Sequence, residues 1–255
     1  MKRIEWTLKK VSIDNVVFGE GIPKIIVPLV GKTKVEILQE IEIVAQSDCD
    51  VVEWRIDHYE KVLDFEETAT FSKKVKQAIN KPLLITFRTV KEGGVCPLQD
   101  EKYFELYHAL MERGDLDLLD IELFMPTEAV KKAVSKAHEK GIKVIMCNHD
   151  FDKTPTKEEI IQRLRTMQEK EADICKIAVM PQNTHDVIVL LDATQEMYHN
   201  YADRPLITMA MGKLGVVSRV SGATFGSSAT FGAAKQVSAP GQVSVNKLKN
   251  ILTSL

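Results

Sequence analysis

The chain has 255 residues, of which 44% are hydrophobic and 27% charged, and its 34 Lys and Arg nearly balance its 36 Asp and Glu. This composition excludes disordered, collagen-like and disulfide-stapled proteins. The net charge of -2 also lacks the basic excess of nucleic-acid-binding proteins, so the expected partner is a small molecule or a second subunit.

The N-terminal segment and the cysteines indicate a soluble, cytoplasmic protein. Glu5, Lys9 and Lys10 interrupt the start of the chain before the apolar core of a signal peptide could develop. No apolar run approaches the ~18 residues that span a bilayer, so we expect no membrane contact. The four cysteines are widely spaced without a CxxC pair, and we expect reduced thiols. They are Cys49, Cys96, Cys147 and Cys175.

Residues 3–18 alternate loosely between apolar and polar side chains, as a β-hairpin does. We expect this hairpin, within residues 1–20, to close one end of the fold. From residue 24 onward, a short β-rich run is repeatedly followed by an amphipathic stretch. The predicted strands are residues 24–30, 51–55, 82–88, 116–122, 143–149, 174–179, 205–211 and 223–226.

Helix signals lie between these strands. The pairs Thr33–Glu36 and Thr156–Glu159 are capping boxes ahead of apolar positions, so each should begin a helix. Residues 127–140 place apolar side chains on one face, and Gly141 then supplies a stop before the next strand.

Eight βα units favour a closed (β/α)8 barrel, with residues 1–255 forming a single domain. The crossovers of βαβ units place helices outside a parallel sheet, and closure of the sheet removes its edges. A doubly wound open sheet would need a glycine-rich phosphate fingerprint after its first strand. Only Gly31-Lys32-Thr33 stands there, so the barrel is the better prediction.

Polar residues recur near the carboxyl ends of the predicted strands, about one βα unit apart. Because side chains two apart share a face of a strand, these residues fall on the face opposite the helices. Barrel enzymes build their active sites at this mouth. The recurring positions are Arg55, Arg88, Glu122, His149, Lys176 and Met211.

Lys176 is the most diagnostic of these residues. An ammonium is costly to bury between apolar neighbours, and a neutral amine is a nucleophile toward ketones and aldehydes. Alternatively, the lysine reaches solvent or pairs with Asp120 or Glu122. His149, on the preceding strand and at a similar height, can exchange protons near neutral pH. A structural histidine bonded to backbone is the alternative there.

Three arginines could recognise a carboxylate, because a guanidinium presents paired donors to two oxygens. They are Arg55, Arg88 and Arg219. The alternative is a set of salt bridges with Glu53, Glu92 and Glu122. Met209 and Met211 could fill the barrel core. Residues 232–242 lie in a stretch rich in Gly, Ala and Ser, which predicts an active-site lid or a plain flexible connection.

Several motifs lie on the predicted strands or close after them. They are residues 23–29, Glu53-Trp54-Arg55-Ile56-Asp57, Thr86-Phe87-Arg88-Thr89, Glu92-Gly93-Gly94, Asn148-His149-Asp150-Phe151, Asp173-Ile174-Cys175-Lys176, Met209 with Met211, Ser218-Arg219, and Phe225 through Gln242. At these residues the chain resembles the type I 3-dehydroquinate dehydratases of the shikimate pathway, and the resemblance covers nearly the whole length.

The resemblance implies a TIM barrel enzyme that converts 3-dehydroquinate to 3-dehydroshikimate, the third step of the pathway to aromatic amino acids. It makes Lys176 the Schiff-base lysine and His149 the general acid/base, with Glu92 orienting the imidazole. It also implies a homodimer, and neither metal nor organic cofactor. The residues that it places around the substrate are Glu53, Arg55, Arg88, Arg219, Ser238, Gln242, Met209 and Met211.

Two other functions are compatible with the same residues. A class I aldolase would also use a Schiff-base lysine, and Gly226-Ser227-Ser228 could then bind a sugar phosphate. A non-catalytic barrel could bind a small carboxylic acid, and its Lys176 would be unreactive.

Overall fold

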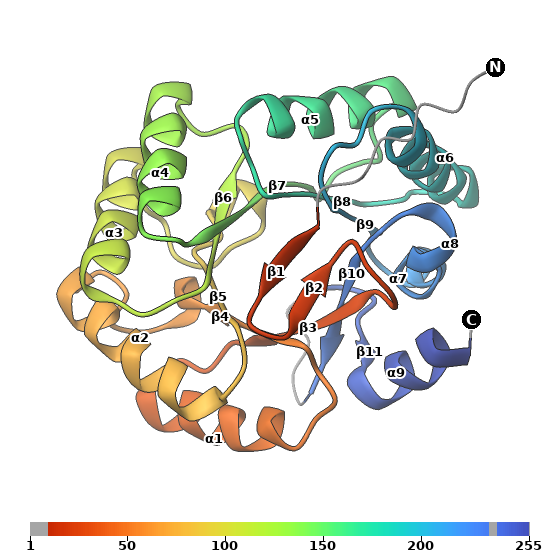
Figure 1. Ribbon diagram of the computed structural model, residues 1–255. Helices are drawn as coiled ribbons and strands as arrows, with labels where there is room; N and C mark the ends of the chain where they lie inside the picture. The colour runs from red at the N-terminus through yellow and green to blue at the C-terminus, as the bar shows by residue number, and fades with distance from the viewer. Residues whose placement is uncertain (1–9, 235–238, 255) are drawn as a thin grey trace.

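The computed structural model of the chain describes residues 10–234 and 239–254. A parallel sheet curls around the centre of the molecule and helices surround it (Figure 1). The strands of this sheet follow one another in chain order. They are β3 (Lys24–Leu29), β4 (Val51–Arg55), β5 (Leu83–Thr86), β6 (Leu118–Glu122), β7 (Lys143–Asp150), β8 (Ile174–Val179), β9 (Leu206–Ala210) and β10 (Ala229–Ala233), with the short β11 (Val243–Ser244) beside β10.

The helices alternate with these strands and bury their apolar faces against the sheet. Thr33 and Glu36 form the expected capping box at the start of α1, and the Thr156 side chain accepts the Glu159 N–H at the start of α5. The helices are α1 (Lys34–Ala45), α2 (Phe65–Ile79), α3 (Asp100–Arg113), α4 (Thr127–Glu139), α5 (Lys157–Glu169), α6 (Thr184–Asn200), α7 (Val216–Val220), α8 (Gly222–Phe225) and α9 (Val245–Ser254), with single 3-10 turns η1 (Ile56–His58) and η2 (Val90–Glu92). In the described part of the chain, none of them combines the length and apolarity that crossing a bilayer requires.

The barrel closes where β10 lies between β3 and β9. β10 pairs with β3 in parallel from Ala229 opposite Lys24 to Phe231 opposite Ile26. On its other side, a bridge joins Leu206 to Ser227, and the N–H of Ser228 donates to the Leu206 carbonyl at 2.7 Å. The predicted fold class, a (β/α)8 barrel, is confirmed.

An N-terminal hairpin covers the end of the barrel at which the strands begin. β1 (Val11–Ile13) and β2 (Val16–Phe18) pair antiparallel and cross the centre of that end (Figure 1). Their four buried apolar side chains pack on the first inward-facing residues of the barrel strands, among them Ile26, Val51, Leu84, Leu118, Ile145, Ile174 and Ile207. The predicted plug is confirmed for the described residues of this segment.

The eighth strand is Ala229–Ala233, and the prediction of residues 223–226 was wrong. The tetrapeptide Ala-Thr-Phe-Gly occurs twice, at residues 223–226 and 229–232. The first copy lies in helix α8 up to Phe225, and Gly226, at φ +97°, ends that helix in the left-handed conformation. Only the second copy reaches the edge of β3, so tertiary pairing decides between two identical sequences.

The register sets the heights of the inward-facing polar residues. Cys147 lies opposite Lys176, and His149 lies opposite Ala178. His149 is therefore one inward-facing position nearer the mouth than Lys176, and the expectation of similar heights was wrong. This offset places the imidazole above the lysine.

The segment predicted as a lid overlaps the sheet. Residues 232 and 233 belong to β10, and residues 235–238 lie outside the described residues. At the far end of the segment, the carbonyl of Pro240 accepts the Gly212 N–H at 3.2 Å. The described end of this loop thus rests on the chain that follows β9, and a lid role stays a prediction.

Candidate active site

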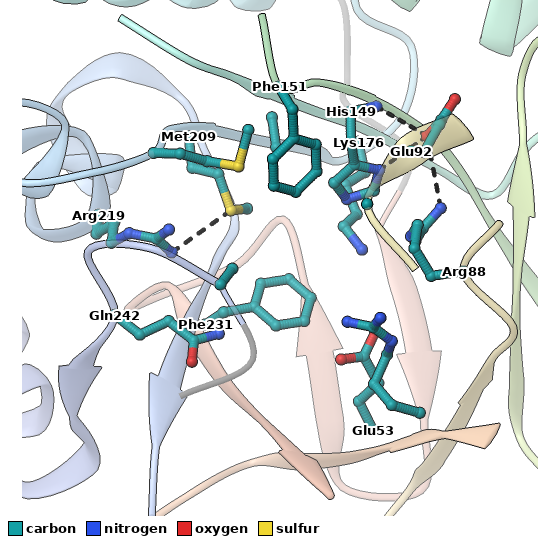
Figure 2. Close-up of a pocket in the computed structure, with 15 residues that line it drawn as sticks. Glu53, Arg88, Glu92, His149, Phe151, Lys176, Met209, Arg219, Phe231 and Gln242 are labelled. Atoms are coloured by element: carbon teal, nitrogen blue, oxygen red, sulfur yellow. Dashed lines mark hydrogen bonds and ion pairs between the residues drawn. The ribbon is translucent and has the colours of Figure 1, made fainter. Parts of the chain in front are cut away.

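A cavity opens at the carboxyl end of the barrel strands (Figure 2), and its empty volume, including the opening to solvent, is about 490 Å³. Four basic side chains line it against two acidic ones, so it suits an anionic ligand. Except for Ser238, which lies outside the described residues, every predicted catalytic or substrate-binding residue lines this cavity. Glu122, predicted at the same mouth, does not line it and is bonded to Arg88. The lining residues are Glu53, Arg55, Arg88, Glu92, Gly93, His149, Phe151, Lys176, Ala178, Met209, Met211, Arg219, Phe231, Ala239 and Gln242.

Lys176 points from β8 into the centre of this cavity (Figure 2) and is only 2% exposed. Its Nζ donates to Oδ2 of Asp120 at 3.0 Å and lies 4.6 Å from the centre of the Phe231 ring. Burial and the nearby cations act in opposite directions on Asp120, and Arg88 and Lys176 prevail, so the pKa of Asp120 is lowered to about 2. The lysine thus lines the cavity and also has a carboxylate partner.

Glu92, the last residue of η2, fixes the imidazole of His149. Oε2 of Glu92 accepts the backbone N–H of His149 at 2.9 Å and lies 2.9 Å from Nδ1 of the ring. Oε1 accepts Nδ2 of Asn148 at 3.1 Å. When Nδ1 carries the proton and donates it to Glu92, Nε2 is left as the acceptor of the ring.

The electrostatic surroundings shift both members of this pair toward their neutral forms. Burial, with the positive charges of Arg88 and Lys176, lowers the pKa of His149 well below its usual range. Burial and the carboxylate of Glu122 raise the pKa of Glu92 to about 8. The imidazole is therefore neutral near pH 7, which is the form that can remove a proton.

Arg55 and Arg88 are held by carboxylates of the protein. Nε and Nη2 of Arg55 contact the two oxygens of Asp57, each at 2.8 Å. Arg88 contacts Oδ1 of Asp120 at 2.8 Å and Oε1 of Glu122 at 3.0 Å. The salt-bridge alternative applies to both arginines, although Asp57, the partner of Arg55, was not among the predicted acids.

Arg219 differs from the other two arginines. It is 1% exposed, and no carboxylate of the described residues lies within ion-pair distance. Its Nη2 donates to the carbonyl of Pro240 at 3.0 Å, its Nη1 lies 3.6 Å from the sulfur of Met209, and its Nε has no partner among the described residues. Burial lowers the pKa of Arg219 to about 10. A buried, unpaired guanidinium is a ready site for a ligand carboxylate.

The remaining predicted residues form the wall. Glu53 accepts the hydroxyl of Thr86 at 2.8 Å, while Met209 and Met211 are buried where β9 ends. Sequence reasoning missed Phe151 and Phe231 as lining residues. Phe151 stands two residues after His149 and could have been included by strand alternation. Phe231 was missed because the eighth strand was placed on the wrong copy of its motif.

One group of side chains in the described part of the chain has donor atoms near enough for a metal, all within 4.8 Å of one another. It consists of Glu92, Cys147 and His149. However, Nη1 of Arg88 lies 2.9 Å from the Cys147 sulfur, and this positive charge disfavours a cation there. Glu92 and His149 also already bond each other, so we assign no metal to them.

Comparisons with known proteins agree with the geometry. The family model for type I 3-dehydroquinase matches residues 25–255. A 3-dehydroquinate dehydratase of Enterococcus faecalis is 54% identical over 246 residues, which cover 96% of this chain and 97% of that protein. One of Salmonella typhimurium is 50% identical over 249 residues, covering 97% and 99%. The solved structure of a type I 3-dehydroquinate dehydratase from Clostridium difficile, with covalently modified comenic acid, has a TM-score of 0.94 at 48% identity and covers 97% and 98%.

Proposed function

The chain belongs to the type I 3-dehydroquinase family, carbon–oxygen lyases that dehydrate 3-dehydroquinate in the shikimate pathway, and we propose that it does so through an imine on Lys176. The observation that carries this mechanism is the meeting of three groups in one cavity. They are a buried lysine, a neutral histidine, and an arginine without a carboxylate partner among the described residues.

Arg219 binds the carboxylate of the substrate. Its buried charge is uncompensated in the described part of the free chain, and a bound carboxylate removes that cost with charge-assisted hydrogen bonds. Arg55 and Arg88, already paired with Asp57 and with Asp120 and Glu122, contribute positive potential and donors toward the hydroxyls. This division of labour positions the ketone against Lys176.

The lysine supplies the covalent step. The neutral imidazole takes a proton from the Lys176 ammonium, and the amine then adds to the C3 ketone. The imidazolium returns this proton to the hydroxyl of the adduct, and loss of water then gives the protonated imine and a neutral ring. Asp120, at 3.0 Å from Nζ, and the ring of Phe231 hold the nitrogen in place during these steps. The imine withdraws electrons from C2 and makes its hydrogens acidic.

His149 moves the proton of the elimination. Nε2 takes a hydrogen from C2, the C–H electron pair forms the enamine, and the enamine expels the C1 hydroxyl. The same imidazolium protonates the leaving oxygen, so water departs and the ring returns to its neutral form. Glu92, bonded to Nδ1, keeps the ring in the productive tautomer. Hydrolysis of the imine releases 3-dehydroshikimate and the free lysine.

Other wall residues complete the enclosure. Glu53 and Gln242 contribute polar contacts to the ring hydroxyls, and Met209 and Met211 form an apolar side. As the family resemblance implies, we assign Ser238 to substrate binding together with Gln242. No cofactor takes part in any of these steps.

Two features disfavour a sugar-phosphate aldolase. The hydroxyl of Ser227 accepts the Thr208 N–H at 3.0 Å, and the hydroxyl of Ser228 donates to the Leu206 carbonyl at 2.8 Å. Both serines therefore serve the closure of the barrel. Neither lines the cavity that contains Lys176.

The test is reduction with borohydride in the presence of 3-dehydroquinate, followed by peptide mass analysis. We expect a stable adduct on Lys176 in the parent chain and in His149→Ala, with turnover lost in the latter. Turnover of 3-dehydroquinate without an adduct on Lys176 would refute the imine mechanism, and activity on a sugar phosphate alone would favour the aldolase.

We also propose a cytoplasmic homodimer. The four cysteines are free thiols, three of them buried, as suits a reducing compartment. The dimer follows from the family resemblance alone, and light scattering on the eluted peak of a size-exclusion column tests it by mass. A monomeric mass at micromolar concentration would reject it.

A further inference from the structure

A chain of hydrogen bonds leads from Glu92 away from the cavity. Asn148 faces the helix side of β7, opposite to His149, and is 4% exposed. It donates Nδ2 to Oε1 of Glu92 at 3.1 Å, and its Oδ1 accepts Nη1 of Arg163 at 2.7 Å. Arg163 comes from α5. The two residues therefore lie behind the pair that Figure 2 shows at the cavity wall, and neither lines the cavity.

The arginine decides which end of the Asn148 amide meets Glu92. An amide can present either its oxygen or its NH2 group, whereas a guanidinium only donates. With Arg163 on one side, the oxygen must face the arginine and the NH2 group must face the carboxylate. Without Arg163 the amide is free to turn its oxygen toward Glu92, where two acceptors would repel each other.

The arginine is itself held in place. Nη2 donates to Glu159, one turn earlier on α5, and Nη1 lies 3.6 Å from Oδ2 of Asp150. Its guanidinium carbon lies 5.4 Å from the centre of the Phe124 ring. Because its position is fixed on three sides, Arg163 can transmit an orientation to Asn148.

From this geometry we propose that Arg163 and Asn148 are positioning residues that favour the ionised form of the Glu92 carboxylate and align it with Nδ1 of His149. The inference rests on the proposed role of His149 as the acid/base of the dehydration. If Glu92 were protonated, its proton would face Nδ1 and shift the ring proton to Nε2. The nitrogen that faces the substrate would then be a donor, unable to take the C2 hydrogen.

The proton balance of Glu92 gives this relay a measurable effect. Burial and Glu122 already raise the pKa of Glu92 to about 8, and the hydrogen bond from Asn148 opposes that rise. Loss of the donor must therefore raise this pKa further. The titratable and charged groups that face Glu92 from the surrounding elements are Arg88, Glu122, Cys147 and His149.

The test compares Arg163→Met with Arg165→Met by the pH dependence of kcat on 3-dehydroquinate. Arg165 lies on the same helix, with its guanidinium carbon 5.0 Å from the centre of the Tyr201 ring, and is the matched control. In Arg163→Met we expect the acidic limb to move up by about one pH unit, kcat at pH 7 to fall about tenfold, and KM to change less than twofold. Arg163→Lys keeps a side chain that can only donate hydrogen bonds, so its acidic limb should return most of the way to that of the parent.

Asn148→Leu is a second variant, with a side chain of similar volume. We expect its acidic limb to move in the same direction as in Arg163→Met, and further. Histidine nitrogen NMR above about pH 8 reads the tautomer of His149 directly. There we expect the ring proton on Nδ1 in the parent and on Nε2 in this variant. An acidic limb at the same pH in Arg163→Met and Arg165→Met, or an unchanged tautomer in Asn148→Leu, would overturn the proposal. Failure of the proposed function shows separately, as a parent enzyme without turnover or without an adduct on Lys176.

Discussion

The two ends of the barrel use the same strands for opposite purposes. Where the strands begin, apolar residues such as Ile174 face inward and the hairpin β1–β2 covers them. Two residues further along β8, the inward position is Lys176, which carries a charge and faces a cavity. One strand therefore serves both ends of the barrel. Apolar packing at the base stabilises the fold, and this stability allows buried charges at the mouth that are unfavourable by themselves.

The largest expected effect comes from removing the reactive amine. Lys176→Met keeps the volume of the side chain, and we expect turnover to fall by about 10⁴-fold or more because no imine can form. Thermal unfolding should change little, since Asp120 keeps Arg88 as a partner. If Lys176→Met retained a tenth of the parent turnover, Lys176 at the mouth would not be the residue that forms the imine.

The matching change at the base should act on stability alone. Phe18 is fully buried in the hairpin, and Phe18→Ala should lower the free energy of unfolding by about 3–5 kcal/mol through the cavity it leaves. Activity per folded molecule should stay within twofold of the parent. Ser12→Ala, at an exposed position of the same hairpin, is the control with no expected effect. A large loss of kcat in Phe18→Ala would show that the two ends are coupled.

Arg219 should separate binding from stability. In Arg219→Met we expect kcat/KM to fall about 100-fold, mainly through KM, because the substrate carboxylate loses its partner. The free energy of unfolding should rise by about 1 kcal/mol, since an unpaired buried charge is replaced by an apolar chain. Arg204→Met, which breaks contacts with Asp203 and with the Ala172 carbonyl outside the cavity, is the comparison. Unchanged KM would move the carboxylate site elsewhere.

Low pH should reduce the stability contributed by the ion pairs at the mouth, and it should leave the apolar packing at the base unchanged. The pKa of Asp120 is about 2 in the folded chain, below the ordinary value of 3.8. This lowered pKa adds stability above the unfolded value, and the gain is lost as pH falls from about 5 to 2. The loss amounts to about 2 kcal/mol. Denaturant titrations across this range should show that slope, and Asp120→Asn should flatten it. An equal slope in both proteins would place the acid sensitivity elsewhere.

Strand alternation predicted most of the fold and of the site. The period of two placed the polar residues of β4 to β8 on the inner face, and the structure has them there, either lining the cavity or bonded to residues that line it. Hairpin and capping signals were equally local and proved correct. These features depend on neighbours along the chain, which a sequence displays.

The failures involved partners that are distant in sequence. The two copies of Ala-Thr-Phe-Gly have the same local preferences, and only contact with β3 distinguishes them. Arg55, Arg88 and Arg219 likewise looked equivalent, because the carboxylates that hold the first two could not be assigned to them from the sequence. The role of Arg163 depends on a bond between β7 and α5 that no spacing rule indicates.

The closure between β9 and β10 has a consequence for the motions of the barrel. β8 and β9 pair through five opposed residue pairs, while the described backbone contacts across this closure are the bridge at Leu206 and the adjoining bond from Ser228. Beside them stand only the side-chain bonds of Ser227 and Ser228, within the described residues. We expect the barrel to open locally at this closure, so that the amide hydrogens here exchange with solvent before those of the other strand pairs. Arg219 lies on one side of this seam, and Phe231 and Pro240 on the other. A substrate that contacts both sides would hold β9 and β10 together. Its binding should therefore slow amide hydrogen exchange at this closure more than anywhere else in the sheet.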